Sequence, residues 1–239
     1  MSETEPSLPP AGRSGHIRSF VRRQGKITAG QRLAREQLLS QWSLPYQATR
    51  LNLEAVFGRA APVTLEIGFG MGETTAQMAQ AMPERNFLGL EVYPAGVGSL
   101  LRRIESEGIA NIRIIEHDAV EVLEHCIGDG CLESVHIYFP DPWPKARHHK
   151  RRLIQPLFIE RLVPKLRLGG LLHCATDWAP YAEQMLEVLE ACSGLQNCAG
   201  RGYAPRPEWR PLTKFESRGL RLGHPVSDLL FARTLVPAA

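Results

Sequence analysis

The chain has 239 residues, 44% hydrophobic and 22% charged, with a net charge of +3 at neutral pH. These values are ordinary for one globular domain, and no apolar run approaches the roughly 18 residues of a membrane-spanning helix. No apolar stretch follows the first charges, so we expect neither a membrane protein nor a secretory signal.

The cysteines and the basic residues indicate where the protein works and what it meets. The five cysteines form no Cys-x-x-Cys pair, which predicts free thiols in the cytoplasm and no disulfide framework or metal site. Residues 13–35 hold seven basic residues and no acidic one, and residues 145–152 hold five basic residues and two histidines. These two clusters predict an anionic partner, although a solvated charged face is the alternative for either one.

In chain order, residues 1–30 predict a flexible basic arm (the N-terminal arm), and residues 31–239 a single domain. A short helix is expected over 31–42. The predicted strands then cover 63–67, 86–91, 112–116, 135–139, 171–175 and 229–236, and the predicted helices cover 75–82, 95–107, 119–127, 153–163 and 180–192. This alternation predicts an α/β fold with a parallel sheet, whose ligands bind beyond the carboxyl ends of the strands.

A glycine turn, residues 68–72, follows the first strand. Gly68, Gly70 and Gly72 stand at every second position before a helix, which lets the chain pass close beneath a nucleotide. Close packing of a helix on a strand also requires glycine. Glu66 beside the turn would repel a diphosphate but suits a ligand with an ammonium group, which favours S-adenosylmethionine (SAM) over a dinucleotide.

Carboxylates follow the next two strands. Glu91 ends the second strand and is placed to accept hydrogen bonds from ribose hydroxyls, as in both NAD and SAM sites. Asp118 follows the third strand, and its role is open between a contact to the amine of adenine and a cap for the next helix.

The proline loop, Phe-Pro-Asp-Pro-Trp-Pro-Lys at 139–145, follows the fourth strand. Its three alternate prolines fix an extended path and hold Asp141 and Trp143 at the ligand edge, where an acceptor base would lie between carboxylate and aromatic ring. Trp143 as a lid over the core is the alternative. Asp177 follows the fifth strand at the same edge, either as a substrate contact or as a helix cap.

The basic block, residues 145–152, starts in the proline loop and is placed to bind phosphates with an affinity that falls with salt. With this block, the sequence resembles the tRNA (guanine-N(7)-)-methyltransferases. The resemblance extends from Arg18 to Thr234, and the proline loop is its most specific part. The motifs that carry it are Leu-Glu-Ile-Gly-Phe-Gly-Met-Gly at 65–72, the proline loop, Thr-Lys-Phe-Glu at 213–216 and Arg-Ser-Phe-Val-Arg-Arg-Gln-Gly at 18–25.

The resemblance implies a class I, Rossmann-like SAM-dependent methyltransferase: a seven-stranded, mostly parallel sheet with an antiparallel last strand and helices on both faces. It implies SAM contacts from the glycine turn, Glu66, Glu91, Asp118 and Asp141, without a metal. The implied substrate contacts are Lys145, Asp177, Thr213, Lys214, Phe215 and Glu216, and the implied RNA contacts are Arg147, His148, His149, Lys150, Arg151 and Arg152. The substrate would be a guanine in the variable loop of tRNA. The sequence indicates no obligate protein partner and leaves monomer or homodimer open.

The chemistry expected of such a site is simple. Nitrogen 7 of guanine has a free lone pair, so the enzyme must align it with the methyl group and stabilise charge that moves onto the purine. Asp141 is the predicted catalytic residue, because it would accept hydrogen bonds from the Watson–Crick edge of guanine, with Asp177 in support. The alternatives are a methyltransferase for another RNA, a protein or a small molecule, an NAD-dependent oxidoreductase, and a non-catalytic RNA-binding protein.

Overall fold

The computed structural model describes residues 19–20, 26–212, 216, 223 and 225–235. The strands are β1 (Val63–Ile67), β2 (Asn86–Leu90), β3 (Ile112–Ile115), β4 (Leu132–Tyr138), β5 (Leu166–Thr176), β6 (Leu195–Asn197) and β7 (Ser227–Arg233). The helices are α1 (Ala29–Trp42), α2 (Leu53–Phe57), α3 (Glu73–Ala81), α4 (Pro94–Ser106), α5 (Ala119–His125), α6 (Pro156–Leu162) and α7 (Ala179–Glu190), with 3-10 helices η1 (Ala146–Arg151) and η2 (Val163–Lys165). No helix of these described parts is both long and apolar enough to cross a membrane.

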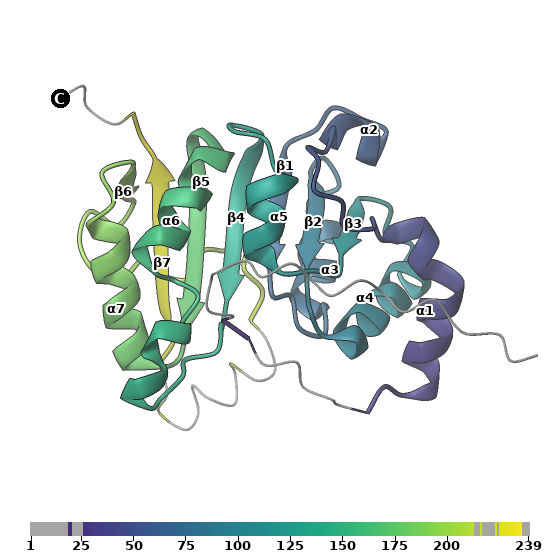
Figure 1. Ribbon diagram of the computed structural model, residues 1–239, viewed down its shortest axis with the longest axis horizontal. Helices are drawn as coiled ribbons and strands as arrows, with labels where there is room; N and C mark the ends of the chain where they lie inside the picture. Colours follow the sequence, from purple (N-terminus) through teal and green to yellow (C-terminus); the bar gives the residue numbers. More distant parts are fainter. Residues whose placement is uncertain (1–18, 21–25, 213–215, 217–222, 224, 236–239) are drawn as a thin grey trace, which may run out of the picture.

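One sheet of seven strands organises the fold, in the order β3-β2-β1-β4-β5-β7-β6 (Figure 1). The pairs from β3 through β5 are parallel, and β7 is antiparallel to both β5 and β6. This confirms the predicted mostly parallel sheet with an antiparallel last strand. The chain builds outward from β1 to β3 and then returns to β4, so the strand order reverses between β1 and β4. Ligands of open α/β sheets bind at such a reversal.

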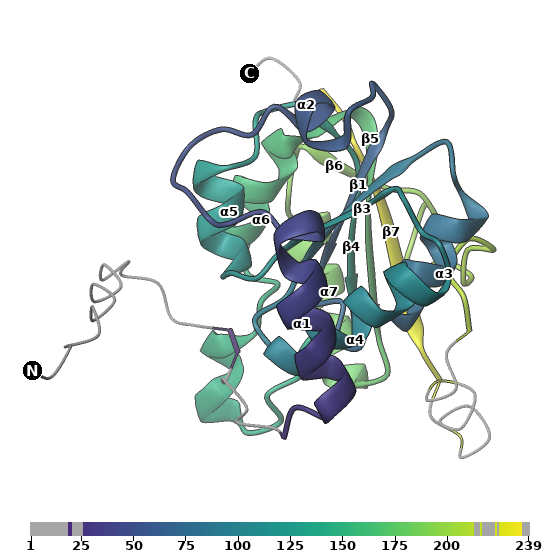
Figure 2. The ribbon, with the colours of Figure 1, turned by 90° about the vertical axis from the view of Figure 1, so that its right-hand side faces the viewer.

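Helices cover both faces of the sheet, as expected. The buried residues of α1, α3 and α4 form one cluster with β2 and β3, whereas those of α5, α6 and α7 pack against β1, β4, β5 and β7. Figure 2 shows α5 and α6 on one side of the strands and α3 on the other. Because both faces are covered, every residue of β1 and β2 is buried, including Glu66.

The structure differs from the sequence prediction mainly at short elements. Helix α2 and strand β6 were not predicted, because five and three residues are too few to show a hydrophobic period. Strand β5 begins at Leu166, before the predicted 171, and Gly169 with a φ of 73° lies within it. Helix α1 begins at Ala29, inside the expected arm, and its N-terminal Thr28 and Gln31 form a capping box.

Candidate functional site

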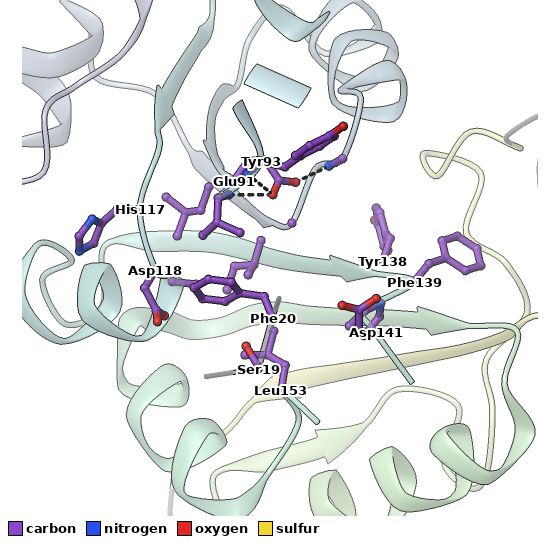
Figure 3. Close-up of a pocket in the computed structure, with 17 residues that line it drawn as sticks. Ser19, Phe20, Glu91, Tyr93, His117, Asp118, Tyr138, Phe139, Asp141 and Leu153 are labelled. Carbon is purple, nitrogen blue, oxygen red and sulfur yellow. Dashed lines mark hydrogen bonds between the residues drawn. The ribbon is translucent and has the colours of Figure 1, made fainter. Parts of the chain in front are cut away.

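A pocket of about 360 Å³ opens where β1, β2, β3 and β4 end (Figure 3). This volume is within the range of small-molecule sites. The described residues that line it are Ser19, Phe20, Ile67, Gly68, Gly70, Leu90, Glu91, Val92, Tyr93, His117, Asp118, Ala119, Tyr138, Phe139, Pro140, Asp141 and Leu153. The structure therefore brings together three of the predicted carboxylates, Glu91, Asp118 and Asp141, from three different strand ends.

Gly68 and Gly70 of the glycine turn line the pocket beside α4. Gly68, Gly70 and Gly72 have φ values of 76°, 57° and 73°, which side chains rarely adopt. Gly72 is not among the lining residues; it precedes α3 and packs on Leu100, where a Cβ would lie 2.7 Å away. A Cβ on Gly96 of α4 would come within 2.1 Å of the Gly70 carbonyl oxygen. The glycine at position 96, in the first turn of the helix predicted over 95–107, was the available sequence signal for this close packing.

Glu91 is held in the pocket by three backbone amides. Its Oε2 accepts a hydrogen bond from the Gly70 amide at 2.8 Å, and its Oε1 accepts from the amides of Val92 at 2.7 Å and Tyr93 at 3.1 Å. Burial raises its pKa, and these amide donors oppose that shift. Three of about four lone-pair positions are taken, so the carboxylate is fixed with an acceptor position left for a ligand hydroxyl.

Glu66 lies deeper than the pocket wall and is not among the described lining residues. It is 3% exposed, and its Oε2 accepts a hydrogen bond from the Thr75 hydroxyl at 2.7 Å. Burial raises the pKa of Glu66 to about 7, with a further contribution from the charge of Glu91 and an opposing one from Thr75. A carboxyl group that is half-ionised near neutral pH is typical of functional sites.

Asp118 takes one of the two roles left open for it, that of a helix cap. Its Oδ1 accepts a hydrogen bond from the Val120 amide at 2.9 Å, so it caps α5. It also lines the pocket, where the adenine contact stays a prediction. The neighbouring His117 was not predicted, and its ring is stacked on Tyr46 with 3.6 Å between centroids. His117 and Tyr93 lie within two residues of the predicted carboxylates Asp118 and Glu91 and also line the pocket. The rule that ligands bind at strand ends would therefore have located them as well.

The proline loop holds Asp141 with an unusual backbone. Phe139 and Trp143 have φ values of 49° and 46°, a conformation that costs a non-glycine residue about 1–2 kcal/mol. The Phe139 amide donates to the Ala175 carbonyl at 2.8 Å, which ties the loop to β5. The Trp143 ring nitrogen donates to the Ser19 carbonyl at 3.1 Å, so Trp143 contacts the arm. Trp143 is not among the described hydrophobic residues that pack on the two core clusters, which contradicts the core-lid alternative.

Two residues of the N-terminal arm enter the site, which the sequence did not indicate. Ser19 and Phe20 line the pocket, and Figure 3 places Phe20 between Asp118 and Asp141. An Arg151 nitrogen lies 3.5 Å from the Phe20 carbonyl oxygen. The arm was predicted only as a partner for a polyanion, and no hydrophobic period marks Phe20 as a pocket residue.

The basic block forms η1, and its members have different environments. Lys145, Arg147 and Lys150 are exposed, and His148, His149 and Arg151 are half-buried. Arg152 is only 3% exposed, so its predicted role as an RNA contact is wrong. Its guanidinium donates to the Pro142 carbonyl at 2.8 Å and to Gln184 Oε1 at 2.5 Å, and it lies over the Tyr181 ring. Arg152 therefore anchors the proline loop to α7.

The predicted substrate residues outside the pocket also have different environments. Asp177 is exposed beyond β5, and α7 is preceded by Trp178 without a side-chain cap, so the capping alternative for Asp177 is wrong. The predicted Thr213, Lys214 and Phe215 lie outside the described residues. Glu216 is 3% exposed and forms two hydrogen bonds of 2.7 Å with Arg210. This burial contradicts a direct substrate contact for Glu216 and indicates an anchor.

The described part of the chain contains no group of three or more His, Cys, Asp or Glu side chains placed to hold a metal ion. The five cysteines are free thiols. What the pocket offers is three carboxylates, backbone amides and aromatic rings. These groups suit an organic ligand with hydroxyl, amine and ammonium groups.

Comparisons with known sequences agree on one family. The family model described as "Putative methyltransferase" matches residues 60–229. A curated tRNA (guanine-N(7)-)-methyltransferase of Bordetella parapertussis is 62% identical over 218 residues, which cover 91% of this chain and 85% of that protein. Proteins of the same name from Nitrosospira multiformis and Paracidovorax citrulli are 57% and 56% identical, covering 91% and 95% of this chain and 94% and 95% of their own lengths.

Solved structures share the fold at low sequence identity. An rRNA methylase of Streptococcus thermophilus is 13% identical with a TM-score of 0.51, covering 88% of this chain and 100% of its own. The 16S rRNA methyltransferase KamB is 16% identical with a TM-score of 0.55, covering 77% of this chain and 93% of its own. At such identities the likeness concerns the arrangement of the elements alone.

Proposed function

The chain belongs to the tRNA (guanine-N(7)-)-methyltransferase family, and on this premise we propose how its residues divide the work of methyl transfer. The enzyme transfers a methyl group from SAM to nitrogen 7 of a guanine in tRNA. The observation that carries the assignment of residues is the pocket in which Glu91, Asp118 and Asp141 meet from three strand ends. We further propose that the guanine lies in the variable loop.

The donor half of the site is the part formed by the glycine turn, Glu91 and Asp118. When bound, SAM supplies a methyl group on a positively charged sulfur. Glu91 is already oriented by three amides and would accept a ribose hydroxyl, and Asp118 would accept from the adenine amine. Glu66, buried beside Thr75, would favour the ammonium end of the ligand when it is ionised.

The acceptor half of the site is the part formed by the proline loop and the end of β5. Asp141 would accept hydrogen bonds from the Watson–Crick edge of guanine, which orients the purine and stabilises the positive charge that develops on it. Asp177, exposed at the same edge, would support this contact. The reaction needs no base to remove a proton from nitrogen 7, so positioning and electrostatics carry the rate.

The phosphates of tRNA would be bound by the members of the basic block that reach solvent. These residues are Lys145, Arg147, His148, His149, Lys150 and Arg151. We extend this interface to the N-terminal arm, residues 1–30, and treat residues 31–239 as the methyltransferase domain. The free cysteines support a cytoplasmic location.

The direct test is incubation with methyl-labelled SAM and unmodified tRNA, followed by nucleoside analysis and mapping. Label in 7-methylguanosine at the variable loop is the expected result. Label in another nucleoside, or at a guanine outside the variable loop, would show that the enzyme methylates a different position. Binding of SAM and of NAD, each measured by titration with tryptophan fluorescence as the signal, distinguishes a methyltransferase from an oxidoreductase. A methyltransferase should bind SAM and not NAD.

A further inference from the structure

A chain of buried polar side chains runs behind the pocket wall. Arg210 is 1% exposed and donates to Asp228 through Nε at 2.8 Å and through a terminal nitrogen at 2.9 Å. It also donates to both Glu216 oxygens at 2.7 Å. Asp228 is in turn 2.7 Å from His173 Nε2, and His173 Nδ1 is 3.0 Å from the Tyr138 hydroxyl. The chain thus runs from Glu216 to Tyr138 without a break.

The chemistry of the partners fixes the direction of these hydrogen bonds. The pKa of Asp228 is lowered, because the donors His173 and Arg210 oppose the effect of burial, so this side chain is an acceptor. Burial lowers the pKa of His173, which is therefore neutral at physiological pH. Its one ring proton lies on Nε2 toward Asp228, and Nδ1 accepts the proton of the Tyr138 hydroxyl. This pattern holds the Tyr138 ring in one orientation.

The two ends of the chain belong to different parts of the acceptor side. Tyr138 ends β4, lines the pocket, and leads directly into Phe139 and the proline loop (Figure 3). Glu216 closes the Thr-Lys-Phe-Glu motif at 213–216. The Arg210 guanidinium lies 5.9 Å from the ring centroids of both Tyr138 and Phe139. The Arg210 side chain therefore contacts the pocket wall at Tyr138 and also contacts Glu216.

Stability alone is a weak explanation for this cluster. Burying a guanidinium with two carboxylates costs desolvation that their attraction roughly offsets, so apolar side chains of equal volume would stabilise the fold as well or better. The ionic groups instead fix the relative positions of the side chains. The planar guanidinium donates its hydrogen bonds in fixed directions, so Glu216 and Asp228 can be placed in only one way around it, and a lysine ammonium cannot reproduce this arrangement.

We infer that Arg210 is a positioning residue, which fixes Glu216 relative to Tyr138 and the loop that holds Asp141. The inference rests on the proposed function, because it assigns Arg210 to the acceptor side of that reaction. The donor half, held by Glu91 and its three amides, shares no described hydrogen bond with Arg210. Loss of the fork should therefore impair tRNA methylation while SAM binding is retained.

The test is Arg210→Lys, assayed well below its melting temperature. We expect kcat/KM for tRNA to fall at least about tenfold, since misplacement of reactants is costly, while the Kd for SAM stays within about twofold. Arg233→Lys is the matched control, because Arg233 lies on β7, the strand that carries Asp228, and donates to the Pro164 carbonyl at 2.9 Å, far from the pocket. This control should keep the wild-type kcat/KM.

Two milder variants keep the inference testable should Arg210→Lys not fold. Glu216→Gln and Tyr138→Phe each break one end of the chain, and each should lower kcat/KM for tRNA without loss of SAM affinity. The double variant should lower kcat/KM for tRNA only as much as the more impaired single variant does. The two fold-reductions should not multiply, because both substitutions break the same chain. Wild-type kcat/KM in the variants, or an equal loss of SAM affinity, would overturn the inference. An inactive wild-type enzyme would instead overturn the proposed function.

Discussion

The guanidinium carbon of Arg151 lies 4.2 Å from the centroid of the Trp143 ring. This contact joins the basic block to the proline loop, and the Trp143 ring nitrogen in turn contacts the arm at Ser19. A guanidinium over an indole ring keeps its charge available to solvent and phosphate, because the ring competes little for its donors. Arg151 is therefore held between Trp143 and the arm, and we predict that its charge contacts RNA.

Replacing Arg151 with alanine should weaken tRNA binding and lower the slope of log Kd against log salt by about 1, the contribution of one phosphate contact. The Kd for SAM should not change. Filter binding at several salt concentrations measures the slope. Arg167→Ala is the control, since Arg167 is exposed on β5 and pairs with Glu133. An unchanged slope in Arg151→Ala would remove this residue from the RNA interface.

The neighbouring Arg152 should behave in the opposite way. Arg152→Met leaves the Pro142 carbonyl and Gln184 without their donor and should destabilise the fold by about 1–3 kcal/mol. The salt slope of tRNA binding by the folded variant should match that of the wild type. Urea denaturation and the same filter assay measure both quantities. A stable variant with a reduced slope would restore Arg152 as an RNA contact.

The pKa of Glu66 predicts a pH dependence of stability. Burial raises this pKa from 4.5 to about 7, so the folded state holds the proton more tightly than the unfolded state. The contribution of Glu66 is therefore most favourable below about pH 4.5 and falls as the pH rises to about 7. A pKa difference of about 2.5 corresponds to about 3 kcal/mol.

Glu66→Gln keeps an acceptor for Thr75 but cannot ionise. It should be as stable as the wild type near pH 4 and more stable, by up to about 3 kcal/mol, near pH 8. It should also bind SAM less tightly at the higher pH, because the ionised carboxylate favours an ammonium group. Urea denaturation and SAM titration across this range measure the two effects. If the free energy of unfolding changed with pH in the same way in the wild type and in Glu66→Gln, the raised pKa of Glu66 would be contradicted.

Glu91→Gln should raise the Kd for SAM about tenfold or more. The NH2 group of glutamine would face a backbone amide donor at Gly70 or Val92, where Glu91 has an acceptor oxygen. Glutamine also lacks the negative charge that strengthens a hydrogen bond from a ribose hydroxyl. Glu116→Gln is the control, since Glu116 pairs with Arg35 outside the pocket. Isothermal titration with SAM provides the measurement. Equal affinities for the two variants would be incompatible with a ribose contact at Glu91.

Asp141→Asn should lower kcat on the order of 100-fold at saturating tRNA and SAM, because a neutral amide stabilises the developing purine charge poorly. Single-turnover methylation isolates the chemical step. Folding should be unaffected, and near-ultraviolet circular dichroism checks this. Near-normal turnover would show that the carboxylate is not needed for catalysis.

The sequence predicted well the helices and strands that have a clear hydrophobic periodicity. Six of the strands and the helices between them lie within a few residues of their predicted ranges, since alternation and strand-end turns are local signals. The same rule located Glu91, Asp118 and Asp141 at one pocket. Glu66 was predicted to contact SAM, but it is buried against Thr75 of α3 and is not among the residues that line the pocket.

What could not be predicted depends on contacts between distant residues. Nothing in the run from 145 to 152 distinguishes Arg151 from Arg152, because the difference arises from Tyr181 and Gln184 on α7. Likewise, Glu216 is buried with Arg210, which is paired with Asp228, and both of these partners lie outside the motif at 213–216. Phe20 reaches the pocket across more than a hundred residues of sequence from Trp143, and no local pattern reports such a contact.

The positive φ values of Phe139 and Trp143 have a consequence for any attempt to make the enzyme more robust. Glycine would relieve about 1–2 kcal/mol of backbone strain at either position. The same change would remove the contacts of a half-buried aromatic ring and raise the conformational entropy of the unfolded chain, which together cost more than the strain. Selection for thermostable variants should therefore leave both residues in place and find its gains elsewhere in the chain.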